Sequence, residues 1–217
     1  MKTFLEKHCT KEWYEFIKFH MKVISFKKKE CIFRGNEKTK GLYIIDTGKV
    51  KVSYVLNDGS QRLIRLAADG DILGHRGFGG NWTYPISAWA LTDTVVEFIP
   101  LEIFNILAKS NVDFLFNLTM FYAEELRKSD LRLKDIPIKH LVADALYDNL
   151  KVFGYENENS TKLSYSLSRT DIASYVGTSY ETVVRKLAEF KKEGVIRIDK
   201  KDIHILDEKK LKALTFY

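Results

Sequence analysis

The segment from Ser168 to Gly194 constrains the fold of this chain more than any other stretch. It opens with "SRTD", a helix-capping signature, and is interrupted at Gly177, a residue type that commonly ends a helix. Thr178 or Ser179 can then cap a second helix, which is expected to end near Gly194. Two short helices joined by a tight turn that contains glycine predict a helix-turn-helix.

An apolar stripe on the second helix determines which of its sides faces outward. The stripe is expected to pack on the first helix and to consist of Val183, Val184, Leu187 and Phe190. Tyr180, Glu181 and Arg185 are then expected on the opposite, outward side. After Gly194, "VIRI" and "IHIL" flank "DKKD" and predict a β-hairpin, so the motif is a winged helix-turn-helix.

Glu181 and Arg185 have the chemistry needed to read DNA bases. A helix-turn-helix inserts the N-terminal part of its second helix into the major groove. There a glutamate can accept a hydrogen bond from cytosine N4, and an arginine can donate two to guanine O6 and N7. The four-residue spacing places both side chains on one face of the helix. The alternative is an ordinary ion pair between them, with Glu181 also helping to cap the helix.

Residues 22 to 100 have the pattern of short strands separated by turns. The stretch "GLYIIDTGKVKVSYVLNDGSQRLIRLAADGDILG" alternates apolar and polar residues, and "NDGS" at 57 to 60 is typical of a hairpin turn. Several such strands at this spacing favour an antiparallel, jelly-roll-like β-roll. Together with the helices that follow, they predict an α+β fold, preceded by a polar, partly helical N-terminal segment.

A long helix is predicted from Asn111 to Ile136, after a short helix at "LEIFNILAKS" and before Pro137. Residues spaced three and four apart form a heptad seam, which consists of Leu115, Leu118, Tyr122, Leu126, Ser129, Leu133 and Ile136. Phe114 and Phe121 lie off this seam, so the helix has two apolar faces, one for the roll and one for a second copy of the chain. The alternative is an internal helix that faces a single core.

These patterns divide the chain into three expected parts. Residues 1–110 form an N-terminal effector-type roll with flanking helices, residues 111–136 form a dimerisation helix, and residues 137–217 form a winged helix-turn-helix domain. The formal net charge of +6 fits an anionic partner, and Arg185 to Lys201 alone contributes seven basic and three acidic residues. No run approaches the roughly 20 apolar residues of a membrane span. The N-terminus is charged and unlike a signal peptide, so a cytoplasmic protein is expected.

The cysteines and histidines of the sequence do not predict a metal site or a redox site. The two cysteines, Cys9 and Cys31, do not form a CxxC spacing, and the five histidines form no HxH or HExxH pair. A disulfide framework, a structural zinc site and an iron–sulfur cluster held by four thiolates are therefore not expected. We predict no metal, no cofactor and no enzymatic activity.

A roll, a long heptad helix and a C-terminal winged helix, in that order, resemble the Crp/Fnr family of bacterial transcription regulators. The stretch "SRTDIASYVGTSYETVVRKLAEFKKEGVI" resembles the DNA-binding signature of that family, and the resemblance covers about residues 22–206. It implies a homodimer that binds an inverted repeat in double-stranded DNA, with Glu181 and Arg185 reading a TGA-like core of each half-site. Members of the cyclic-AMP branch have arginine where this chain has Tyr180, so the outer bases of the half-site stay open. Activators of the family also contact RNA polymerase.

Further residues of the winged helix are expected to contact phosphates, which position a protein on DNA without reading its sequence. The expected phosphate contacts are Ser168, Arg169, Thr178, Ser179, Thr182 and Lys186, together with Lys200 and Lys201 of the "DKKD" wing. The lysines would add affinity that does not depend on sequence.

Cyclic-nucleotide-binding relatives share a cassette of roughly Gly-Glu-Leu followed some ten residues later by Arg-Ser/Thr-Ala. In the matching stretch "GDILGHRGFGGNWTYPISAWA", His75 stands at the glutamate position and Ile86 at the arginine position, just before Ser87. Both ionic contacts to the nucleotide are missing. Because burying a phosphate without a charged partner is unfavourable, cyclic AMP is not expected as the effector.

Two interpretations of the same glycine-rich stretch stay open. Its backbone amides can form an anion-binding nest for an unknown small-molecule effector, in a pocket made by Gly74, His75, Arg76, Gly77 and Ser87. The favoured interpretation is that the glycines shape a turn of the roll and leave His75 and Arg76 in solvent. His75 is also the one candidate for the axial ligand that haem-sensing relatives need, and two cysteines are too few for the cysteine cluster of oxygen-sensing relatives.

The function that these features favour is sequence-specific DNA binding by a homodimeric transcription regulator, whose effector is absent or is not cyclic AMP. One alternative is a small-molecule-binding signalling module whose C-terminal helices contact proteins. Another is a cupin-like enzyme built on the roll, which would need clustered histidine and carboxylate ligands that these strands do not supply.

Overall fold

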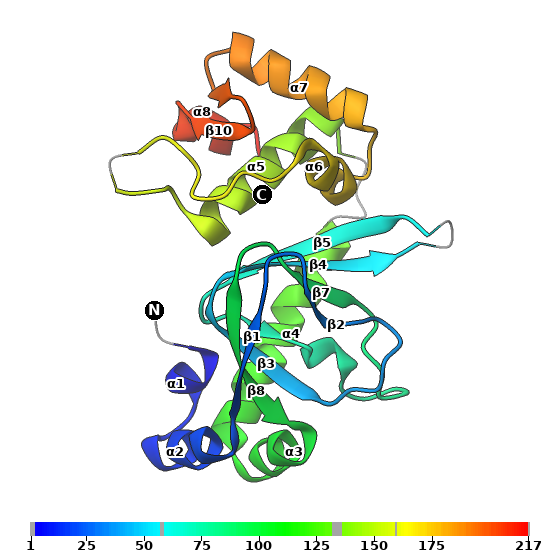
Figure 1. Ribbon diagram of the computed structural model, residues 1–217, viewed down its shortest axis with the longest axis vertical. Coiled ribbons are helices and arrows are strands. Elements are labelled where there is room, and N and C mark those ends of the chain that lie inside the picture. The colour runs from blue at the N-terminus through cyan, green and yellow to red at the C-terminus, as the bar shows by residue number, and fades with distance from the viewer. Residues whose placement is uncertain (1–2, 57–58, 132–135, 159, 217) are drawn as a thin grey trace. The chain divides into compact units, whose positions relative to one another are not determined.

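The computed structural model describes residues 3–56, 59–131, 136–158 and 160–216 (Figure 1). Contacts between residues divide the chain into two compact units. The first unit is Met1–Tyr54 with Ala67–Lys134, and the second is Val55–Leu66 with Asp135–Tyr217. The long helix that we expected to stand as a separate part therefore groups with the roll.

The roll consists of two four-stranded sheets. One sheet has the order β1 (Lys22–Phe26), β8 (Thr94–Pro100), β3 (Gly41–Thr47) and β6 (Ile72–Leu73). The other has the order β2 (Cys31–Phe33), β7 (Ser87–Ala90), β4 (Lys49–Val55) and β5 (Gln61–Ala68). Paired strands such as β1 and β8, β3 and β8, and β4 and β7 run antiparallel. The predicted antiparallel roll is confirmed.

Four helices pack on the core of the first unit. They are α1 (Phe4–His8), α2 (Lys11–His20), α3 (Leu101–Ser110) and α4 (Val112–Leu131), and Figure 1 shows α1, α2 and α3 gathered at one end of the sheets. Leu42 and Ile44, which lie on one face of β3 because side chains alternate along a strand, are fully buried. Leu5, Leu107 and Phe114 reach the same core from α1, α3 and α4. The face of β3 that carries Leu42 and Ile44 thus forms the surface to which these helices attach.

The helix α4 uses one of its sides for this core. It begins after Asn111, whose side-chain oxygen accepts a hydrogen bond from the Phe114 amide at 2.9 Å. Phe114 and Leu118 are buried, whereas Leu115 and Phe116 on the other side are exposed. Because a helix turns by about 100° per residue, the roll can cover only one of the two apolar faces.

The second unit is a winged helix-turn-helix, as predicted. Its elements are α5 (Ile138–Phe153), α6 (Arg169–Val176), α7 (Tyr180–Lys192), β9 (Ile196–Asp199), β10 (Asp202–Ile205) and α8 (Glu208–Ala213). The buried side chains that hold them together include Val142, Leu146, Ile172, Val183, Leu187, Phe190, Ile203 and Leu211. Within the described ranges of the chain, no helix combines the length and the hydrophobicity of a membrane span.

The segment "LSYSL" at residues 163–167 alternates apolar and polar residues, which predicts a short strand, but no strand is formed there. The described residues of this segment make only isolated bridges, one of which joins Leu163 to Tyr155. Ser164 Oγ donates a hydrogen bond to the Phe153 carbonyl at 2.5 Å, and Ser166 Oγ accepts one from the Ile203 amide at 2.8 Å. Serine side chains that bond to the backbone compete with a regular ladder, which explains the error.

Gly177 provides a test of the turn between α6 and α7. Its φ of 80° lies in the left-handed region, where an L-residue with a Cβ costs about 1–2 kcal/mol and asparagine is tolerated better. We expect Gly177→Ala to lower the opening free energy of α6 and α7 by about 1–2 kcal/mol, and Gly177→Asn to lower it less. Hydrogen exchange of peptides from these helices measures this opening free energy. Tryptophan fluorescence would not report on it, because all three tryptophans lie in the first unit. If both variants lower the opening free energy equally, the added Cβ, rather than the backbone conformation, causes the effect.

Candidate nucleic-acid interface

The two helices of the motif are capped as the sequence predicts. Ser168 Oγ accepts a hydrogen bond from the Asp171 amide at 3.0 Å and thereby starts α6. Ser179 Oγ accepts one from the Thr182 amide at 3.2 Å and starts α7, so Ser179 is the cap and Thr178 is not. Ser168 and Ser179 each use their hydroxyl group for the helix end, which gives them a structural role in addition to the predicted phosphate contact.

The core side of α7 determines which residues face outward. Val183, Leu187 and Phe190 are almost completely buried, at spacings of four and three residues. Glu181 and Arg185 are exposed on the other side, and no ion pair joins them in the described part of the chain. Their carboxylate and guanidinium groups are therefore presented together to a partner, and the alternative of a plain ion pair loses support.

Val184 corrects the predicted apolar stripe. It was expected to be buried beside Val183, yet 42% of its surface is exposed. A helix that buries Val183, Leu187 and Phe190 turns the next residue by about 100° away from the core. Val184 thus lies on the outward face, with Tyr180 one turn before it at 52% exposure.

Lys186 does not extend freely from the helix. Its Nζ lies 2.8 Å and 2.9 Å from the two carboxylate oxygens of Glu189, one turn further along α7. Its side chain is also more buried than that of a free surface lysine. We predicted a phosphate contact for Lys186, but in this arrangement its charge is already paired, so it is a weaker candidate than the lysines of the wing.

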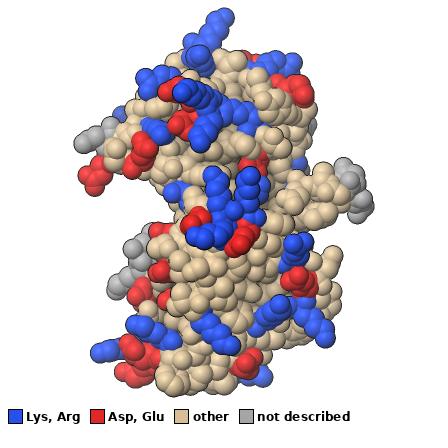
Figure 2. Space-filling model, in the orientation of Figure 1, with Lys and Arg blue, Asp and Glu red and all other residues tan. Residues whose placement is uncertain are grey.

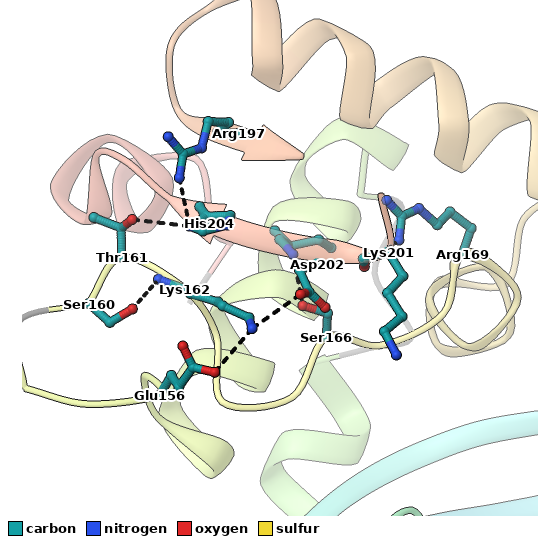
Figure 3. Close-up of polar contacts among 11 residues, drawn as sticks. Glu156, Ser160, Thr161, Lys162, Ser166, Arg169, Arg197, Lys201, Asp202 and His204 are labelled. Carbon is teal, nitrogen blue, oxygen red and sulfur yellow. Dashed lines mark hydrogen bonds and ion pairs between the residues drawn. The ribbon is translucent and has the colours of Figure 1, made fainter. Parts of the chain in front are cut away.

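The wing is a hairpin of β9 and β10 in which Asp199 pairs with Asp202 across the turn. Lys200 and Lys201 form this turn and are exposed, and Lys200 has a positive φ of 51°. Figure 3 shows the Arg169 side chain reaching the turn, where its Nη1 donates a hydrogen bond to the Lys201 carbonyl at 2.9 Å. Arg169, predicted as a phosphate contact, therefore also ties the start of α6 to the wing.

An ion pair attaches the wing, next to its turn, to the loop before α6. Lys162 Nζ lies 3.0 Å from Glu156 and 3.2 Å from Asp202, as Figure 3 shows. On the face of the molecule that Figure 2 shows, basic side chains are interspersed with acidic ones. Charge on that face therefore does not by itself locate a nucleic-acid interface.

The expected effector loop is packed against the protein's own helix. His75 opens a short 3₁₀ helix, η1 (His75–Gly77), and is only 3% exposed. Its ring lies 5.0 Å from that of Phe121 and 5.7 Å from that of Tyr122, both on α4. The Tyr122 hydroxyl donates a hydrogen bond to the His75 carbonyl at 2.5 Å. Burial raises the pKa of this hydroxyl to about 12, so it stays protonated at neutral pH.

Arg76 is likewise attached to α4. Its Nη2 lies 2.9 Å from a carboxylate oxygen of Glu125, and both side chains are mostly buried. The expectation that His75 and Arg76 lie in solvent is therefore wrong. This arrangement could not be predicted from local sequence patterns, because α4 follows the loop by more than thirty residues and covers it only through the tertiary fold.

The remaining residues of the expected pocket are also engaged. Ser87 Oγ accepts a hydrogen bond from the Gly35 amide at 2.9 Å. Gly77 lies so close to Thr39 that a Cβ would collide with its hydroxyl, which itself donates to the Gly77 carbonyl at 2.7 Å. Gly74 has a left-handed φ of 82°, which any L-residue with a Cβ would adopt only with strain. The glycines thus shape the loop, in agreement with the favoured interpretation of the sequence.

The cysteines and histidines do not gather into a metal centre. Among the residues that the structure describes, no group of three or more His, Cys, Asp or Glu side chains could hold a metal ion. Burial raises the pKa of the Cys9 thiol to about 11 and also raises that of Cys31, so neither is a reactive thiolate.

Comparison with known proteins agrees with both units. Residues 23–111 match the model of a cyclic nucleotide-binding domain, and residues 142–214 match that of a Crp-like helix-turn-helix domain. The chain is 27% identical over 191 residues to the transcriptional activator protein Anr of Pseudomonas aeruginosa, which covers 87% of this chain and 78% of that protein.

Two further similarities extend along nearly the whole chain. The CRP-like cAMP-activated global transcriptional regulator of Mycobacterium tuberculosis is 26% identical over 191 residues, which covers 87% of this chain and 85% of that protein. The structure of FixK2 from Bradyrhizobium japonicum superposes with a TM-score of 0.78 at 23% identity and covers 91% of this chain and 98% of that one. The latter similarity supports the fold.

The pair of Glu125 and Arg76 provides a test of how α4 holds the loop. A hydrogen bond to a charged group contributes about 1.5–3 kcal/mol and an ordinary one about 0.5–1.5 kcal/mol. Because the amide oxygen of glutamine can still accept from Arg76, we expect Glu125→Gln to lower the free energy of unfolding of the first unit by the difference, about 1 kcal/mol. Glu124→Gln is the matched control, because Glu124 pairs with Arg127 on the surface, where a pair contributes only about 0.2–0.5 kcal/mol. Urea unfolding followed by tryptophan fluorescence measures both. If both variants lower the free energy of unfolding by similarly small amounts, the pair of Arg76 and Glu125 does not stabilise the loop on α4.

Proposed function

The chain belongs to the Crp/Fnr family of DNA-binding transcription regulators, and we propose that it acts as a homodimer that reads TGA-like half-sites of an inverted repeat without cyclic AMP as its effector. The observation that carries this proposal is the exposed pair of Glu181 and Arg185 on α7, opposite the buried side of that helix. A glutamate can accept from cytosine N4 and an arginine one turn away can donate to guanine O6 and N7, so the pair matches groups that a G·C base pair presents in the major groove.

Contacts to phosphates would position this helix. Lys200 and Lys201 at the tip of the wing are exposed, and they supply charge without reading sequence. Arg169 has further N–H donors besides the one that bonds to the Lys201 carbonyl, so it can contact a phosphate and the wing at the same time. Lys186 contributes less, because Glu189 already pairs with it.

The exposed side of α4 supports a homodimer through a face that coincides only in part with the predicted seam, in Leu115 and Leu126. Leu118 is buried in the roll and Tyr122 bonds to His75, so these two seam residues serve the roll. Leu133 lies outside the described residues. The apolar side chains that α4 leaves exposed are Val112, Leu115, Phe116, Met120 and Leu126. Apolar side chains that recur at this helical spacing on an uncovered face are typical of a helix–helix interface.

The packing around His75 supports an effector other than cyclic AMP, or none. The position that holds the ribose in cyclic-nucleotide-binding relatives is filled by a buried imidazole, and Arg76 is paired with Glu125. Ile86 cannot neutralise a phosphate. A cyclic nucleotide would therefore have to displace packed aromatic rings and would gain no ionic contact in return.

The proposal is tested by selecting DNA from randomised duplexes at near-physiological salt, with purified protein and no added ligand. We expect an enriched inverted repeat with TGA-like half-sites. A folded, dimeric protein that enriches no sequence would contradict ligand-independent reading, and a second selection with cell extract would then distinguish a required effector from a module that binds proteins.

Arg185 is expected to read bases rather than to attract DNA in general. Arg185→Ala should weaken binding by about 1–3 kcal/mol at each half-site, or about 2–6 kcal/mol for the dimer on the selected repeat, and should leave most of the weak, salt-dependent binding to unrelated DNA. Lys209→Ala on α8 is the control for the loss of one charge. Titrations of labelled duplexes measure both affinities. Equal losses on specific and unrelated DNA would contradict the role in base reading.

The dimer surface is tested on α4. Phe116 is 59% exposed there, so Phe116→Glu should place a charge in the interface and raise the dimer dissociation constant at least tenfold. Phe19→Glu on α2 is the control, because Phe19 is 85% exposed on another helix. Sedimentation velocity over a range of concentrations measures the dissociation constants. A Phe116→Glu protein that stays as dimeric as the Phe19→Glu protein would exclude this face.

A further inference from the structure

A second row of side chains follows the outward face of α7. Tyr180, Val184 and Ala188 are all exposed and are spaced four residues apart, so they lie one above the other on the helix. At about 100° per residue, Val184 lies between Tyr180 and Glu181 around the helix axis. The apolar row therefore runs beside Glu181 and Arg185, on the face that would meet the groove.

The core of the second unit does not account for this row. Val183, Leu187 and Phe190 already bury the inner side of α7, and none of the three residues of the apolar row takes part in that core. A β-branched residue such as Val184 also favours a helix less than the residues usually found on a helix surface. Its presence at an exposed position of α7 therefore calls for a partner outside the unit.

The major groove of DNA presents one apolar group that can be the partner of Val184. Each thymine presents its C5-methyl group there, and apolar side chains recognise thymine by contact with this methyl. A valine has two methyl groups close to the helix backbone, and it is held in few rotamers. It can bury a thymine methyl without the loss of side-chain freedom that a longer residue would suffer.

We propose that Val184 is a specificity-determining residue that packs against the 5-methyl group of a thymine next to the base pair contacted by Glu181. This inference rests on the proposed function and adds to it the residue that reads a thymine of the TGA-like half-site. Tyr180 borders the same contact and shields it from water. The row thus reads an apolar group, while Glu181 and Arg185 read hydrogen-bonding groups.

The test uses the duplex that the selection yields. Each thymine of the half-site is replaced in turn by deoxyuridine, in both half-sites at once, which removes only the methyl group. Burial of one methyl-sized group changes an equilibrium constant by about fourfold, so the two half-sites together should lose about fifteenfold at one thymine. With Val184→Ala, affinity for the thymine duplex should fall, and the difference between thymine and deoxyuridine at that position should disappear.

Control variants separate this contact from a general effect on the helix. Val184→Thr keeps one methyl group and the branched shape, so it should retain part of the discrimination. Ala188→Ser, in the same row but a turn further from the helix N-terminus, should retain all of it. Hydrogen exchange of α7 peptides checks that each variant is folded.

The outcomes distinguish this inference from the function on which it rests. If the unmodified protein binds a specific repeat but tolerates deoxyuridine at every position, or if Val184→Ala keeps the full discrimination, the inference is overturned and the proposed function stands. If the protein prefers no sequence at all, the proposed function fails and the inference fails with it.

Discussion

Burial of one side of α7 is the constraint on which the proposed DNA-facing surface depends. Fully burying an aliphatic or aromatic side chain stabilises a fold by about 1.5–3 kcal/mol, and Val183, Leu187 and Phe190 are all almost completely buried. The helix cannot rotate about its axis without exposing them. Their position therefore determines that Glu181 and Arg185 point outward, and the left-handed turn at Gly177 sets where along the chain this helix begins.

The same physical logic divides the faces of α4. The roll needs Phe114 and Leu118 for its core, and it uses Tyr122 to bind the His75 carbonyl. Once these residues face inward, the helix geometry leaves Phe116 and Met120 outside. One helix thus packs on the loop of His75 and Arg76 with its inner side and offers an apolar surface with its outer side. The loop and the proposed dimer surface are consequently coupled through a single rigid element.

Local signals made most of the fold predictable from the sequence. Capping serines and left-handed glycines act within a few residues, so the bounds of α6 and α7 follow from Ser168, Gly177 and Ser179. Alternation along the strands predicted the antiparallel roll for the same reason. Because these rules depend on neighbours in the chain, they do not require knowledge of the tertiary fold.

The errors concern residues whose burial depends on distant parts of the chain. Val183 and Val184 are both apolar and adjacent, and only the position of the core decides which one is buried. A heptad spacing could not show that Leu118 belongs to the roll. His75 and Arg76 looked like solvent-exposed turn residues because their partners on α4, Phe121, Tyr122 and Glu125, are far away in sequence.

The wing illustrates how a surface can be ordered without losing its charge. Asp202 lies beside Lys200 and Lys201 and would offset part of their attraction for phosphate, but Lys162 pairs with it at 3.2 Å. Arg169 meanwhile bonds to a backbone carbonyl, which carries no net charge, rather than to a carboxylate. The turn is therefore fixed in place while its two lysines keep their charge toward the solvent. If Lys200 and Lys201 themselves formed the ion pairs, the wing would be held equally well, but their charge would be neutralised and an anionic partner would be attracted less.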